Sequence, residues 1–124
     1  MRGPGTTILV VDDDGLITLN TADILNDLGH TVLEAFSAHE ALSLMEQHPD
    51  IGVLITDYGM PGMNGLELAE AARRRKPDLP VLLTTGYAEL PEHGDIAIAR
   101  LGKPFREDEL LASLSQLLTQ TAAE

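Results

Sequence analysis

Short apolar runs rich in β-branched residues alternate with helical patterns along almost the whole chain. The runs predict strands over residues 7–11, 31–36, 53–56, 80–84 and 96–101, and apolar residues at helical spacing predict helices over 16–28, 38–47, 66–75 and 107–118. Nearly continuous apolar strands between helices are typical of a parallel sheet that is covered on both faces. Because crossovers are right-handed, we expect a doubly wound α/β fold around a five-stranded parallel sheet.

Capping residues support the predicted helix ends. Ser37, with Glu40 three residues later, has the pattern of a capping box, and Asn64 is a candidate N-cap. Gly29 is expected to end the first helix, because glycine accepts the left-handed conformation found there. The apolar face of that helix is predicted from the spacing of Leu16, Leu19, Ala22, Leu25 and Leu28.

Reactive side chains stand at the ends of four predicted strands. They are Asp12, Asp13 and Asp14 after the first strand, Asp57 after the third, Thr84 and Thr85 at the end of the fourth, and Lys103 after the fifth. The carboxyl ends of parallel strands meet at one edge of the sheet, so we expect these side chains to gather there. Gathered carboxylates repel one another unless a cation lies among them. Oxygen ligands without His or Cys predict Mg²⁺, with Mn²⁺ as a substitute.

A carboxylate in such a cluster can act as a nucleophile and accept a phosphoryl group. Phosphoryl transfer depends on positioning and charge, and a metal ion, a lysine ammonium and a threonine hydroxyl supply what the phosphoryl oxygens need. The same residues also have structural alternatives. These are a helix N-cap for Asp13 and above all for Asp14, a local turn bond for Asp57, packing for Thr84 and an ordinary surface position for Lys103.

Composition limits the classes of function. The 124 residues predict one domain over 7–120, with a flexible leader over 1–6 and a tail over 121–124. Asp and Glu number 20 against 8 Lys and Arg, and the net charge of -12 argues against direct binding to nucleic acid or membranes. There is no cysteine, and no apolar run approaches the roughly 20 residues of a membrane span. We therefore expect a cytoplasmic protein.

Four segments together resemble the receiver domain of two-component response regulators. They are Ile-Leu-Val-Val-Asp-Asp-Asp at 8–14, Asp-Tyr-Gly-Met-Pro-Gly-Met-Asn-Gly at 57–65, Leu-Thr-Thr-Gly at 83–86 and Lys-Pro-Phe at 103–105. Each segment is weak evidence alone, but the four in this order and on these elements are specific. The resemblance covers residues 8 to 118 and implies a flavodoxin-like strand order of 2-1-3-4-5.

The resemblance implies a metal site and a phosphoacceptor. Asp12 and Asp13 match the acidic pair that holds the metal ion in receivers. Asp57 matches the residue that carries the phosphoryl group and also contacts the metal. Gly59 matches the position whose backbone carbonyl is a further metal ligand. The expected cofactor is therefore Mg²⁺, with Mn²⁺ as a substitute.

The same resemblance implies a signalling switch and not an enzyme. Thr85 matches the hydroxyl, and Lys103 the ammonium, that contact the phosphoryl group in receivers. The expected phosphoryl donor is a sensor histidine kinase or a histidine phosphotransfer protein, and phosphorylation is expected to change the binding of a downstream protein. Residues 23–34 and 83–87 look similar to receivers of hybrid sensor kinases, so the chain is either a stand-alone regulator or a receiver taken from a longer protein.

Two features depart from the receiver pattern. Receivers have an aromatic switch residue three positions before the lysine, where this chain has Arg100, whose charge stays hydrated or paired. Candidate partners for a salt bridge with it are Glu89, Glu92 and Asp95. The segment between the switch threonine and the lysine is also short and contains glycine and proline. A helix over 88–95 is therefore expected to be truncated or irregular.

Two other classes of function remain open. A Mg²⁺-dependent phosphatase of the haloacid dehalogenase type also uses an aspartate nucleophile at a strand end. That family needs a second acid two residues later, where this chain has Gly59. A pseudo-receiver would instead bind partners without phosphorylation, and the complete set of acidic, threonine and lysine residues argues against it.

Overall fold

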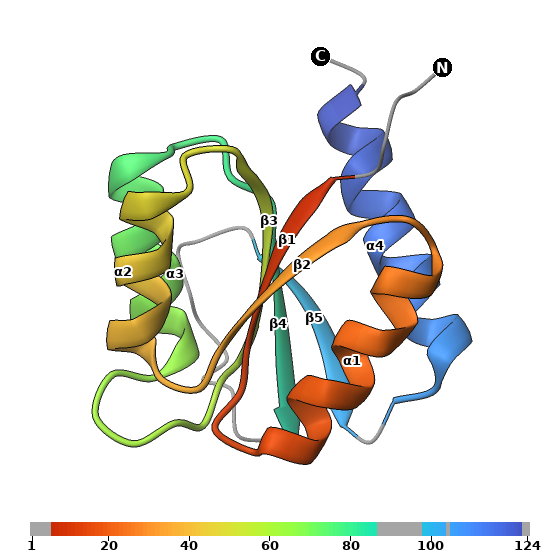
Figure 1. Cartoon of the computed structure of the whole chain (residues 1–124), viewed down its shortest axis with the longest axis horizontal. Coiled ribbons are helices and arrows are strands. Elements are labelled where there is room, and N and C mark those ends of the chain that lie inside the picture. Colours follow the sequence, from red (N-terminus) through yellow and green to blue (C-terminus); the bar gives the residue numbers. More distant parts are fainter. Residues whose placement is uncertain (1–5, 87–97, 104, 123–124) are drawn as a thin grey trace.

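A computed structural model of the chain has a parallel sheet between two layers of helices (Figure 1). The structure describes residues 6–86, 98–103 and 105–122. Its strands are β1 (Thr7–Val11), β2 (Thr31–Ala35), β3 (Ile51–Asp57), β4 (Val81–Gly86) and β5 (Ala99–Lys103), and its helices are α1 (Gly15–Asp27), α2 (Ala38–Gln47), α3 (Gly65–Arg75) and α4 (Glu107–Ala122). The five strands are parallel in the order β2-β1-β3-β4-β5, so the predicted fold class and strand order are confirmed.

Each face of the sheet has its own core. Helices α2 and α3 cover one face, and α1 and α4 cover the other (Figure 1). Alternate residues of β1 divide between the two cores: Leu9 packs with residues of α2 and α3, whereas Ile8 packs with residues of α1 and α4. Because both faces are buried, β1 is apolar at nearly every position and shows no alternation. Among the described residues, no helix has the length and apolar character that a membrane span requires.

The predicted capping residues act at the helix ends. Gly29 has a φ of 94°, and its amide donates to the carbonyl of Asn26 at 3.0 Å, which ends α1. The hydroxyl of Ser37 accepts a hydrogen bond at the start of α2. Asn64 and Glu67 form a complete capping box at the start of α3. This last cap fixes where the loop after β3 turns into a helix.

The predicted apolar face of α1 is wrong at three positions. The exposed fractions of Leu16, Leu19 and Leu28 are 79%, 52% and 50%. Ala22 and Leu25 are buried as predicted, and Thr18 and Thr21 complete the buried face. These four residues also follow helical spacing, and three of them, Thr18, Thr21 and Ala22, have small side chains. A prediction from hydrophobicity alone buries the leucine face. In the structure the face with Thr18 is buried, and Thr18 forms hydrogen bonds at the start of α1.

Strand β5 ends later than the predicted range of 96–101. It runs from Ala99 to Lys103, so Lys103 is its last residue and not part of the following loop. Residues 87–97 lie outside the described residues, and with them the predicted truncated helix over 88–95 and the candidate acidic partners of Arg100. Residues 1–5 of the predicted leader also lie outside them. Thr6, the last residue of that leader, is hydrogen-bonded through its carbonyl to the amide of Thr31.

Alanine substitution on α1 tests which face of this helix is buried. Leu25 is fully buried, so Leu25→Ala is expected to lower the free energy of unfolding by about 2–5 kcal/mol. Leu19 is exposed on the same helix, so Leu19→Ala is expected to change it by less than about 0.5 kcal/mol. Urea denaturation of the two variants measures the difference. A larger loss for Leu19→Ala would contradict the observed orientation of α1.

Candidate functional site

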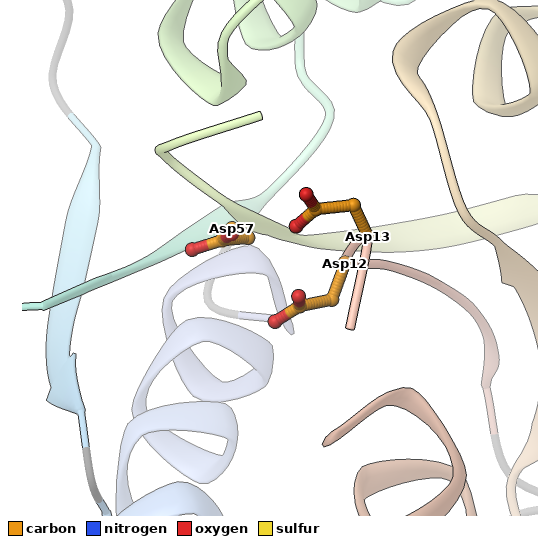
Figure 2. Close-up of side chains that lie close together, drawn as sticks. All are labelled: Asp12, Asp13 and Asp57. Atoms are coloured by element: carbon orange, nitrogen blue, oxygen red, sulfur yellow. The ribbon is translucent and has the colours of Figure 1, made fainter. Parts of the chain in front are cut away.

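Acidic side chains from two neighbouring strands lie together at the carboxyl edge of the sheet. Asp12 and Asp13 follow β1, and Asp57 ends β3. One carboxylate oxygen from each of the three lies within 4.8 Å of the others, and Figure 2 shows the three side chains close together. Asp12 and Asp57 are buried, whereas Asp13 is exposed to solvent. The structure therefore brings together the three acids that the strand ends predict.

Hydrogen bonds hold Asp12 at the bend where β1 ends. Its amide donates to the carbonyl of Ala35 on β2 at 3.2 Å. Its Oδ1 accepts from the amide of Asp14 at 2.9 Å. The side chain of Asp14 in turn accepts from the amides of Leu16 and Ile17, so its predicted role as an N-cap is confirmed. Asp14 therefore serves the start of α1 and is not one of the three clustered acids.

Lys103 joins the two buried carboxylates. Its Nζ lies 3.2 Å from Oδ2 of Asp12 and 2.9 Å from Oδ1 of Asp57. Burial lowers the pKa of Lys103, but its hydrogen bonds and charge attraction to Asp57 and Asp12 outweigh this effect and raise the pKa above its ordinary value. The ammonium is therefore held in its charged form between the two acids. An ordinary surface position for Lys103 is excluded by these contacts.

Burial raises the pKa of Asp57 above its ordinary value. The hydrogen bond from Lys103 lowers it, and the negative charges of Asp12 and Asp13 raise it. The net direction is upward, so the neighbouring ammonium does not fully compensate the cost of ionising Asp57 in this environment. A further positive charge near the carboxylate would favour its ionised form.

The donor set fits a hard divalent cation. Three carboxylates and one ammonium leave an excess of two negative charges at the edge of the sheet when all are ionised. All three candidate ligand groups offer oxygen, which Mg²⁺ and Mn²⁺ prefer. Gly59 is exposed in the loop two residues after Asp57, between β3 and α3. The cluster is thus compatible with a divalent metal ion.

The two threonines at the end of β4 are both buried and differ in their neighbours. Thr84 pairs in register with Asp57, and its hydroxyl donates to the carbonyl of Thr56 at 3.5 Å, in agreement with the packing role predicted for it. Thr85 is one residue closer to the end of the strand and pairs with Gly102, next to Lys103. This position leaves Thr85 as the candidate for the hydroxyl that contacts a phosphoryl group.

Gly65, the first residue of α3, was not predicted as part of the site. A Cβ atom on it would overlap the carbonyl oxygen of Asp57 and lie 2.9 Å from Cδ1 of Leu83. Its amide donates to the carbonyl of Tyr58 at 2.8 Å. The helix therefore starts in direct contact with the backbone of Asp57. A glycine just after the Asn64 cap, where other residues favour helix more, is the sequence signal that could have shown this close approach.

Comparison with known families decides the class of this site. The response regulator receiver domain family matches residues 8–115, which is most of the chain. The chain belongs to this family. The resemblance recognised in the four sequence segments is therefore confirmed, and the acidic cluster lies in a receiver domain.

Similar proteins include one of nearly the same length as this chain and others that are longer. A chemotaxis protein CheY homolog of Campylobacter jejuni is 36% identical over 129 residues, covering 94% of this chain and 95% of the homolog. The sensor kinase CckA of Brucella abortus is 32% identical over 119 residues, covering 90% of this chain but 12% of the kinase. The response regulator SaeR of Staphylococcus aureus is 32% identical over 121 residues, and the match spans 51% of its length.

Solved receiver structures share the whole fold. The receiver domain protein from Clostridium thermocellum superposes with a TM-score of 0.88 at 27% identity, covering 96% of this chain and 98% of that one. The chemotaxis protein CheY4 from Vibrio cholerae superposes with a TM-score of 0.82 at 29% identity, covering 90% and 98%. The receiver in this chain therefore has the complete set of strands that brings the acidic residues to one edge.

Alanine at Gly65 tests the contact between α3 and the backbone of Asp57. The added Cβ has no room, so Gly65→Ala is expected to lower the free energy of unfolding by about 1–3 kcal/mol. Gly15 is a matched control, because it also follows an acidic or amide N-cap at the start of a helix and has nothing within 4 Å of a Cβ. Gly15→Ala is expected to be neutral or stabilising by up to about 1 kcal/mol. Equal effects in urea denaturation would contradict the contact.

Asparagine at Asp57 tests the raised pKa of this residue. The folded state holds the Asp57 proton more tightly than the unfolded chain does. Protonated Asp57 therefore adds to the free energy of unfolding at low pH, and this contribution is lost as the pH rises above the ordinary pKa of 3.8 and through the raised pKa. Without divalent metal, Asp57→Asn is expected to be more stable than the wild type at pH 7. This advantage should shrink toward pH 3.

Urea denaturation at several pH values in EDTA measures this dependence. Asp23→Asn is the control, because Asp23 is exposed on α1 away from the cluster. It is expected to have little effect at any pH. An Asp57→Asn variant that is less stable than the wild type at pH 7 would show that ionised Asp57 stabilises the fold, against the upward direction of its pKa.

Proposed function

We propose that the chain is a phosphorylation switch, in which Asp57 accepts a phosphoryl group in the presence of Mg²⁺. The observation that carries the proposal is the cluster of Asp12, Asp13 and Asp57, joined by Lys103 at the carboxyl edge of a receiver sheet. Phosphorylation then changes the affinity for a protein partner. The chain works as a signalling switch and not as an enzyme that turns over small substrates.

In this proposal the acidic pair and the loop after β3 hold the metal ion. The ligand groups are the carboxylates of Asp12, Asp13 and Asp57 and the backbone carbonyl of Gly59. Bound Mg²⁺, or Mn²⁺ in its place, supplies positive charge that offsets the repulsion between the carboxylates and the phosphoryl oxygens. The excess negative charge at the cluster and its oxygen-only donors support this assignment.

Asp57 acts as the nucleophile. One of its carboxylate oxygens attacks the phosphorus of a phosphohistidine on the donor, and the bond between phosphorus and the histidine nitrogen breaks. The imidazole leaves with the electron pair and takes a proton. Lys103, which already lies 2.9 Å from Asp57, pairs with one phosphoryl oxygen, and the hydroxyl of Thr85 donates to another.

The proposed donor is a sensor histidine kinase or a histidine phosphotransfer protein. The relatives that support this are named as response regulators, chemotaxis proteins and a sensor kinase. The domain over 7–120 serves either as a regulator by itself or as the receiver of a longer protein. The net charge of -12 favours a partner protein with a cationic surface over nucleic acid or an anionic membrane.

In this proposal, Arg100 helps to transmit the effect of phosphorylation from Asp57 to the surface that binds a partner. Arg100 is exposed on β5, an edge strand, and pairs in register with Leu83 of β4. An arginine keeps its charge hydrated or paired, so it does not move between buried and exposed positions as an aromatic residue does. We therefore propose that Arg100 responds to phosphorylation by forming or breaking a salt bridge. Its candidate partners are the acidic residues of 87–97.

The two alternative functions have less support. A phosphatase of the haloacid dehalogenase type needs a second acid where this chain has Gly59, and the chain belongs to the receiver family. A pseudo-receiver would not need the ammonium of Lys103 placed between Asp12 and Asp57. That contact supports the switch, because Lys103 is a cation beside the carboxylate that is proposed to accept the phosphoryl group.

Incubation with acetyl phosphate and Mg²⁺ tests the proposed function. The wild type is expected to gain the mass of one phosphoryl group per chain, because acetyl phosphate can replace phosphohistidine as a donor. Asp57→Asn is expected to gain none, since its amide is not a nucleophile. Intact-protein mass spectrometry measures the adduct, and the same incubation in EDTA shows whether the metal is required.

The outcomes separate the three candidate functions. A stoichiometric adduct that needs Mg²⁺ and Asp57 supports the switch. A folded wild type without any adduct favours the pseudo-receiver and contradicts the proposal. Continuous release of phosphate from several phosphate esters would favour the phosphatase. Asp50→Asn is the control and is expected to be phosphorylated like the wild type, because Asp50 is exposed and precedes the start of β3, whereas Asp57 is the last residue of that strand.

A further inference from the structure

Thr18 connects the first turn of α1 to the end of β1. Its side chain is fully buried although it is polar. Its single hydroxyl proton is shared between the carbonyl oxygens of Asp12 and Asp14, which lie 3.0 and 3.1 Å from Oγ1. A threonine hydroxyl often bonds the carbonyl four residues earlier in its own helix, which accounts for Asp14. Asp12 lies six residues earlier and outside the helix, so this second contact needs a different explanation.

The carbonyl that Thr18 contacts belongs to the peptide unit between Asp12 and Asp13. A peptide unit is planar, so a bond to its carbonyl also fixes the orientation of the following amide. The amide of Asp12 is held separately by the carbonyl of Ala35 at 3.2 Å. The backbone is therefore anchored on both sides of the Asp12 Cα atom. The directions in which the Asp12 and Asp13 side chains leave the backbone follow from these anchors.

Loss of the hydroxyl would leave the Asp12 carbonyl without this donor in a buried place. A buried carbonyl without a partner is unfavourable, so the peptide between Asp12 and Asp13 would turn toward another donor or toward water. That rotation would move both carboxylates relative to Asp57. The effect would fall on the geometry of the acidic cluster and not only on the stability of α1.

We propose that Thr18 is a positioning residue for the metal site. Its hydroxyl fixes the peptide between Asp12 and Asp13, so that the two carboxylates face Asp57. Thr18 acts through the backbone and is not itself a ligand. This proposal rests on the proposed function for the identity of the cation. If it holds, the first turn of α1 also affects the affinity of the acidic cluster for Mg²⁺.

Three substitutions separate the hydroxyl from the shape of the side chain. Thr18→Val keeps the shape and removes the hydroxyl, and Thr18→Ser keeps the hydroxyl. Thr21→Val is the matched control, because Thr21 is buried on the same face of α1 and the hydrogen bonds described for Asp12 do not include it. Titration with Mg²⁺, followed by amide NMR shifts, measures the dissociation constant of each variant.

Thr18→Val is expected to weaken Mg²⁺ binding about tenfold, because residues that orient metal ligands commonly have effects of this size. Thr18→Ser and Thr21→Val are expected to bind within about twofold of the wild type, since in both the hydroxyl at position 18 is kept. Urea denaturation of the same variants measures their stability separately. A purely structural role would lower the stability of Thr18→Val and leave the Mg²⁺ affinity unchanged.

An unchanged Mg²⁺ affinity in folded Thr18→Val would overturn the inference. If Thr18→Val does not fold, the pair Thr18→Ser and Thr18→Ala gives the same comparison, because the two differ by one hydroxyl. Equal affinities in that pair would also overturn it. A wild type that binds no Mg²⁺ would contradict the proposed function. A wild type that binds Mg²⁺ no better than Thr18→Val would contradict only the role of Thr18.

Discussion

The carboxyl edge of this receiver depends on the ammonium of Lys103 between two buried carboxylates. Asp12 and Asp57 lie at the ends of neighbouring strands, and their charges would repel each other without a cation between them. Lys103 reaches both because β5 follows β4 in the sheet and ends at this residue. Residues at the ends of β1, β3 and β5 thus contact one another through a single ammonium. Its single charge leaves part of the negative charge uncompensated, and this imbalance is the physical reason to expect a divalent metal ion.

The fold and the acidic cluster could be predicted from the sequence because both follow from topology. Apolar runs between helices specify a doubly wound parallel sheet, and such a sheet places the ends of its strands at one edge. Asp12, Asp13 and Asp57 therefore come together whatever the details of packing. Lys103 was expected at the same edge, after the fifth strand, and β5 reaches its position two residues beyond the predicted end. The roles proposed for these residues in metal binding and phosphorylation go beyond their geometry.

The contacts that support the cluster could not be predicted, because they depend on tertiary packing. Two faces of α1 have helical spacing, and the face with Leu16 and Leu19 is the more apolar, yet these residues are exposed. The observed face carries Thr18, whose hydroxyl reaches the carbonyl of Asp12. Gly65 likewise matters through a close approach to the Asp57 backbone, and a glycine after an N-cap does not by itself predict such an approach, since Gly15 has the same local position and open space around it. Hydrogen bonds and steric fit, more than hydrophobicity, place the elements around the site.

A crystal structure of the chain grown with Mn²⁺ would show directly whether the acidic cluster binds a metal ion, because anomalous scattering locates the metal without assumptions about its ligands. We expect one strong peak among the carboxylates of Asp12, Asp13 and Asp57, with the backbone carbonyl of Gly59 as a neighbour. Lys103 is expected to remain next to Asp57. Peaks only at exposed carboxylates elsewhere, with the acidic cluster empty and Lys103 alone between Asp12 and Asp57, would show that the cluster is not a metal site.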